Sequence, residues 1–104
     1  MDNSKQVALT IMEQIRWNRV RAMTGAKNPS YGKDTDGNPY FGFTLPRGLA
    51  GRGIQWVRII LTPKDLYTVV SGNRKGNPVE TREDVYADGL VKALEGVTSL
   101  AFSL

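Results

Sequence analysis

The sequence contains neither cysteine nor histidine among its 104 residues. It therefore has no disulfide, no thiolate zinc site, no cysteine nucleophile and no serine–histidine pair. The side-chain groups that remain available for catalysis are carboxylate, hydroxyl, lysine, arginine and tyrosine groups. They form no recognisable catalytic motif or metal-ligand cluster in this sequence. We expect a protein that is not an enzyme and that needs no cofactor or metal.

Long hydrophobic runs are also missing. No apolar stretch approaches the roughly 18 residues that a membrane span needs, and residues 1–5 lack the basic segment followed by an apolar one that is typical of a signal peptide. We expect no membrane partner and a cytoplasmic location. The length fits one α+β domain spanning residues 1–104.

Positive charge is in modest excess, with 14 lysines and arginines against 10 aspartates and glutamates and a net charge of +4. Phosphate binding depends on the local field rather than on the total, so the clustering of the cations is more informative. The clusters are Arg16, Arg19 and Arg21; Arg47 and Arg52; and Arg74 and Lys75. They are candidate phosphate ligands, and the alternative is a solvated surface that keeps the protein soluble.

The densest run of β-branched and aromatic residues lies between glycine and proline at residues 53–63. Its length and its boundaries predict a central strand over residues 54–61. At a period of two, Val57 and Ile59 share one face, whereas Ile54, Trp56 and Arg58 share the other. We expect Trp56 to contribute mainly to packing, because a tryptophan in a central strand buries a large area.

The same periodicities assign the rest of the chain. They predict helices over residues 4–17 and from about residue 82 to Gly96, and strands over residues 19–24, 40–45, 66–71 and 79–81. Short links between the later strands favour antiparallel pairing. The expected fold is a two-layer α+β sandwich, in which the N-terminal and C-terminal helices cover one face of an antiparallel sheet of four to five strands.

The composition of two segments indicates loops. Residues 25–39 are rich in Gly, Pro, Asn and Asp without apolar periodicity, which indicates a long loop. Within it, residues 34–38 begin like a calcium loop, but Leu45 occupies the twelfth position where that motif needs glutamate, so a plain turn with Asp36 and Gly37 at its tip is favoured. Residues 46–53 are read as a hairpin connection rather than a phosphate loop, because the Walker spacing is absent.

The sheet face opposite the helices is predicted to be open and rich in arginine and aromatic side chains. On these registers it carries Arg19, Arg21, Met23, Tyr40, Trp56, Arg58 and Tyr67. Such a face suits stacking on bases and pairing with phosphates, and it equally suits a protein interface. The candidate ligand-binding residues are Arg19, Arg21, Tyr40, Arg47, Arg52, Arg58, Arg74 and Lys75.

Three segments together resemble a family of small uncharacterised proteins from bacteriophages and mobile elements. They are AMTGAKN at residues 22–28, WVRIILTPKDLY at 56–67, and VYAD at 85–88 followed by TSL at 98–100. The resemblance implies an accessory role in the host-cell cytoplasm and assigns no catalytic residues. We expect a protein that binds nucleic acid or nucleotides; the alternative is a protein-binding modulator of a host or defence protein, and self-association could accompany either.

Overall fold

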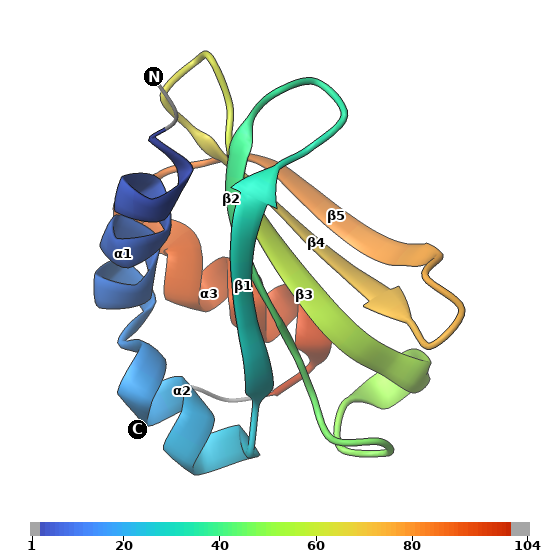
Figure 1. The fold of residues 1–104 in the computed structure, drawn as a ribbon. Coiled ribbons are helices and arrows are strands. Elements are labelled where there is room, and N and C mark those ends of the chain that lie inside the picture. The colour runs from blue at the N-terminus through green and yellow to red at the C-terminus, as the bar shows by residue number, and fades with distance from the viewer. Residues whose placement is uncertain (1–2, 101–104) are drawn as a thin grey trace.

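A five-stranded antiparallel sheet forms one layer of the structure, a computed structural model that describes residues 3–100. The strands follow each other in sequence order and in space (Figure 1). They are β1 (Lys27–Lys33), β2 (Pro39–Thr44), β3 (Ile54–Leu61), β4 (Tyr67–Asn73) and β5 (Pro78–Val85). The predicted strand over residues 54–61 is confirmed, and it is the middle strand of the sheet.

Helices cover one face of this sheet, which confirms the predicted α+β sandwich (Figure 1). They are α1 (Ser4–Ile15), α2 (Trp17–Thr24) and α3 (Leu90–Thr98), with 3₁₀ turns at Gly51–Gly53 and Ala87–Gly89. The core joins the apolar stripes of the helices to one face of the strands. Its largest fully buried side chains include Phe41, Ile11, Ile15, Ile59 and Leu94. None of the helices within residues 3–100 is long and apolar enough to cross a membrane.

The segment at residues 19–24 is a helix, so the predicted strand there is wrong. Arg16 adopts a left-handed conformation with φ 57°, which ends α1 and starts α2 in a new direction. Trp17, Val20 and Thr24 are buried at a spacing of three and four residues. The arginines of this short segment alternate with other residues, which matched the period of a strand. The spacing of its buried residues is that of a helix.

The predicted long loop over residues 25–39 is also wrong, because most of it forms the edge strand β1 and its turn into β2. An edge strand pairs on one side only and β1 is mostly exposed, so its sequence lacks the apolar alternation of a half-buried strand. The expected turn is confirmed. Asp34 Oδ1 accepts hydrogen bonds from the backbone N–H groups of Asp36 (2.9 Å) and Asn38 (2.8 Å).

The C-terminal helix begins later than predicted, because residues 82–85 belong to β5. Asp84 has a φ of 55° at an irregularity between β4 and β5, which lets the strand continue to Val85. Gly89 therefore precedes α3, and Gly96 lies within it, since the helix ends at Thr98 with Ser99 as its C-cap. Residues 101–104 lie outside the described part of the chain.

A second irregularity decides which face of the sheet the first side chains of β3 occupy. The register between β3 and β4 shifts between Ile54 and Trp56. Ile54 is fully buried in the core, whereas Trp56 is half-buried on the opposite face. The prediction that both share one face is wrong because a strict period of two does not pass through a bulge.

Candidate functional site

The sheet face opposite the helices carries a group of aromatic and cationic side chains, which we call the open face. Tyr40, Trp56 and Arg58 lie there on adjacent central strands, each of them half-buried. On the other face of the same strands, Phe41 and Ile59 are no more than 1% exposed. The two faces therefore differ, one covered by helices and fully buried, the other partly exposed.

Arg58 and Tyr40 form a stacked pair on this face. The guanidinium carbon of Arg58 lies 4.0 Å from the centroid of the Tyr40 ring, within the range of a cation–π interaction. The ring in turn lies against Gly32, where a β-carbon would come within 3.2 Å of the tyrosine oxygen. Gly32 thus lets the ring rest close to β1, and the guanidinium plane is held over it.

The indole ring of Trp56, a residue of β3, lies against the neighbouring strand β4 in a similar way. A β-carbon at Gly72 would overlap the six-membered ring of the indole, so this glycine is the surface on which the ring rests. The indole N–H donates a hydrogen bond to the backbone oxygen of Asn73 at 2.9 Å. The ring is therefore fixed in position by a contact and by a directed bond.

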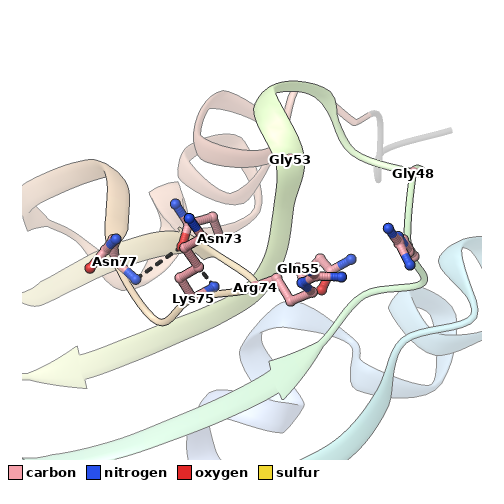
Figure 2. A pocket seen from close by; sticks show the side chains of 8 residues that line it. Gly48, Gly53, Gln55, Asn73, Arg74, Lys75 and Asn77 are labelled. Atoms are coloured by element: carbon pink, nitrogen blue, oxygen red, sulfur yellow. Dashed lines mark hydrogen bonds between the residues drawn. The ribbon is translucent and has the colours of Figure 1, made fainter.

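A basic pocket lies at the end of the sheet where β3 begins and β4 ends (Figure 2). Its volume is about 520 Å³, and its lining residues are Arg47, Gly48, Gly53, Gln55, Asn73, Arg74, Lys75 and Asn77. None of these residues, all within the described part of the chain, carries a negative charge. Three predicted ligands, Arg47, Arg74 and Lys75, thus meet in one place, although they come from two separate connections.

The turn that carries two of these cations is held by Asn73. Its side-chain oxygen accepts hydrogen bonds from the backbone N–H groups of Lys75 (3.0 Å) and Asn77 (3.1 Å). Gly76 supplies the left-handed conformation that the turn needs, with φ 88°. Because Asn73 also accepts the bond from Trp56, one residue joins the open face to the basic pocket.

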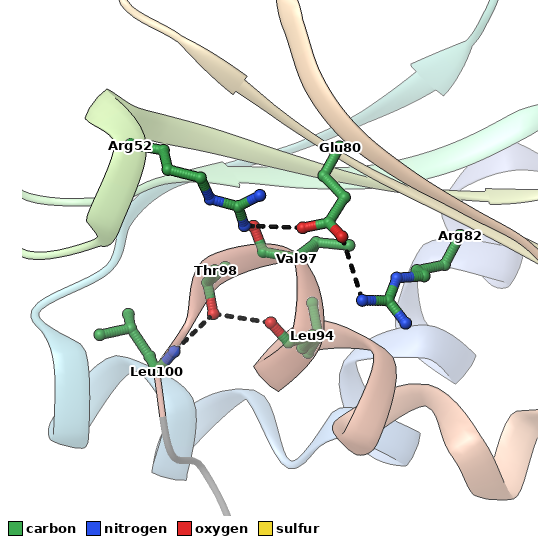
Figure 3. A network of polar contacts seen from close by, with 7 residues as sticks. All are labelled: Arg52, Glu80, Arg82, Leu94, Val97, Thr98 and Leu100. Carbon is green, nitrogen blue, oxygen red and sulfur yellow. Dashed lines mark hydrogen bonds and ion pairs between the residues drawn. The ribbon is translucent and has the colours of Figure 1, made fainter.

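Arg52 does not join the basic pocket. It forms an ion pair of 2.6 Å with Glu80 on the helix side of the sheet, and Arg82 bonds the other oxygen of Glu80 at 3.0 Å (Figure 3). Hydrogen bonds from Arg52 and then from Arg82 hold the pKa of the Glu80 carboxyl below its ordinary value. This network links the segment before β3 to β5 and α3, which is a structural role.

The remaining predicted residues lie elsewhere. Arg19 and Arg21 are on α2, in the helical layer, so they do not share a face with Arg58. Tyr67 is only 6% exposed and lies in the core, where burial raises the pKa of its hydroxyl. The predicted site is therefore divided: Tyr40 and Arg58 lie on the open face, the basic pocket holds a second group, and α2 carries a third.

Sequence reasoning missed the glycines that shape the open face. Gly32, Gly42 and Gly72 all lie inside strands, where glycine weakens a sheet and often marks the close approach of another group. That signal was present in the sequence. Which aromatic ring lies against each glycine depends on the register between strands, which no local pattern reveals.

Comparison of the chain with protein-family models, with curated proteins and with solved structures found no match. Within residues 3–100, no three acidic side chains cluster closely enough to hold a metal ion.

Proposed function

We propose that the protein binds single-stranded nucleic acid without catalysing a reaction, with bases on the open face and phosphates in the basic pocket. One observation carries this proposal: the Tyr40–Arg58 pair and Trp56 share the open face, and the hydrogen bond from Trp56 to Asn73 connects that face to a residue of the basic pocket. Single-stranded binders combine such aromatic or guanidinium platforms with a positive groove for the backbone.

The chemistry of each part fits this division. A guanidinium plane held over an aromatic ring offers its outer face to a base, as arginine does in recognition of unpaired bases. Arg47 and Arg74 can each hold a phosphate through two N–H groups, and Lys75 adds a point charge. A duplex would hide its bases from the platform, so a single strand fits both parts at once.

A salt titration tests the proposal. A fluorescent single-stranded oligonucleotide is titrated with the protein at increasing salt, and the slope of log affinity against log salt is measured by anisotropy. The double variant Arg74→Ala/Lys75→Ala should reduce the magnitude of this slope by about 1.4, since each phosphate that is neutralised on a single strand accounts for about 0.7. Arg58→Lys, which keeps the charge but loses the planar group, should weaken binding while leaving the slope unchanged.

The matched control is Lys5→Ala/Arg21→Ala, which removes the same charge from exposed positions on α1 and α2. It should leave the slope nearly unchanged. Equal losses in the two double variants would show that only net charge matters and would remove the assigned site. Absence of binding at about 50 mM salt, where phosphate contacts are strong, would reject nucleic-acid binding altogether.

A second candidate function is binding of a host or phage protein, and exposed aromatic side chains near the two edges of the sheet favour it. Tyr31 on β1 is 53% exposed, and Tyr86, which follows β5, is 68% exposed. Tyrosine is a frequent anchor of protein interfaces, and edge strands can pair with a strand of a partner. Substitution of Tyr31 and Tyr86 by serine should abolish such binding while leaving oligonucleotide binding intact.

A further inference from the structure

A small hollow lies on the open face above Gly42, in the middle of β2. Its volume is about 150 Å³. Its lining residues are Asn28, Ser30, Gly42, Phe43, Thr44, Trp56, Val57 and Arg58. We call it the Gly42 hollow.

The hollow exists because the side chains around it lean away from it. Trp56 lies over Gly72 on one side, and Arg58 lies over Tyr40 on the other. Gly42 has no side chain to occupy the space between them, and a β-carbon there would already lie 3.2 Å from the backbone oxygen of Val57. The floor is therefore bare backbone, with a guanidinium group and an indole ring among its walls.

Polar groups of β1 form the edge of the hollow. The side-chain amide of Asn28 donates a hydrogen bond of 2.9 Å to the hydroxyl of Thr44, which donates to the backbone oxygen of Lys27 at 3.2 Å. Asn28 is itself positioned by a bulge, with φ 55°. Its amide oxygen and second N–H have no partner among residues 3–100, and the hydroxyl of Ser30 has none either.

We infer that the Gly42 hollow takes one nucleobase of the bound strand and reads its polar edge. This inference rests on the proposed function. The hollow of about 150 Å³ is several times the roughly 10–15 Å³ that one water molecule needs, so a planar ring can enter it. Arg58 and Trp56 contact the base, and the amide of Asn28 with the hydroxyl of Ser30 supplies the donor and acceptor that a base edge requires.

The consequence is that binding depends on the base at one position of the strand. A strand with an abasic residue at that position should bind about tenfold more weakly, the lower part of the range that stacking of one base contributes. The identity of the base at that position should also change affinity several-fold, because a wrong edge leaves Asn28 and Ser30 without partners.

The experiment compares labelled single strands that differ only in base: homo-oligonucleotides of A, C and T, and a set in which an abasic residue is moved along one strand. The informative variant is Asn28→Gly, because glycine accepts the left-handed backbone at this bulge while removing the amide. Asn38→Gly, in the turn between β1 and β2, is the matched control. If Asn28→Gly does not fold, as judged by its thermal transition, Ser30→Ala on the exposed edge replaces it.

A base preference that Asn28→Gly abolishes, with the salt slope unchanged, supports the inference. Equal affinity for all bases and for the abasic strands overturns it while leaving the proposed function intact, because the phosphate contacts would remain. A preference that survives both Asn28→Gly and Ser30→Ala also overturns it. Failure of every strand to bind at about 50 mM salt removes the inference together with the proposed function.

Discussion

The contact between Trp56 and Gly72 makes a sharp prediction about stability. In Gly72→Ala, the added methyl group would overlap the six-membered ring of the indole. The backbone of β4 cannot withdraw, because it is paired with β3 on one side and with β5 on the other. The indole itself must therefore move away, and its hydrogen bond to Asn73 is broken or lengthened.

The expected cost follows from three contributions. Overpacking costs about 1–3 kcal/mol. Loss of the indole hydrogen bond adds about 0.5–1.5 kcal/mol. Because the φ of Gly72 lies outside the left-handed region, alanine is compatible with the backbone and returns about 0.4–1 kcal/mol through the unfolded chain. We expect a net loss of about 2 kcal/mol, which corresponds to a fall in Tm of about 10 °C for a domain of this size.

Chemical denaturation followed by circular dichroism measures this loss independently of the indole's own fluorescence. The decisive comparison is a double-mutant cycle with Trp56→Ala, which removes the ring that the methyl group would strike. In that background Gly72→Ala should be neutral or slightly stabilising. Emission from Trp56, isolated by Trp17→Phe, should shift to the red in Gly72→Ala as the ring moves into water.

Two results of the cycle would refute the reasoning. If Gly72→Ala costs the same with and without the indole, the penalty comes from the backbone and not from the contact. If it costs less than about 0.5 kcal/mol in the otherwise natural chain, the size of a typical surface effect, the ring does not rest on Gly72 in solution.

Three further predictions concern stability. Ser71→Ala should stabilise the protein by about 1 kcal/mol, because the Ser71 hydroxyl is buried without a partner among the described residues. Thr98→Val, which removes a buried hydroxyl that has a partner, should destabilise the protein by a similar amount. Urea denaturation measures both changes, and a loss of stability in both variants would contradict this account. The lowered pKa of Glu80 means that its contribution to stability is present above about pH 4.3, the ordinary glutamate value, and is lost as the pH falls through the lower folded value. The stability difference between the natural chain and Glu80→Gln should therefore shrink in acid, and a difference independent of pH would argue against the ion pairs. Arg16→Gly should raise Tm slightly, because it relieves the backbone strain of a left-handed arginine, which is about 1–2 kcal/mol. This gain exceeds the cost of about 0.4–1 kcal/mol from the entropy that glycine adds to the unfolded chain. Glu13→Gly within α1, where the backbone is helical, should lower Tm.

The elements that were predicted correctly are those with a strong internal pattern. Helix α1 has buried residues on one stripe, β2 has Phe41 and Phe43 at alternate positions, and β3 is a dense run of β-branched residues between glycine and proline. These patterns reflect burial of one face, which is a local consequence of the two-layer fold. The elements that were missed, α2 and β1, are short or mostly exposed, so burial left only a weak pattern in them.

The candidate site was predicted as one group of arginines and aromatic residues, and only parts of that group meet. Tyr40 and Arg58 are neighbours because β2 and β3 pair in one particular register. Arg52 was assigned to a phosphate-binding cluster, yet it pairs with Glu80, which is distant in the sequence. A list of cations cannot separate a cation that is paired with a carboxylate of the same chain from one that is free to meet a ligand.

The amino-acid sequence was enough to establish the class of the fold and the central strand, because hydrophobic periodicity records which side of each element is buried. Which side chains share the open face depends on the tertiary structure. Strand register placed Trp56 on Gly72 and left the hollow above Gly42, and the meander brought the connections around Arg47 and Arg74 to the same end of the sheet. Such contacts join residues that are remote along the chain, and they form only when the whole sheet assembles.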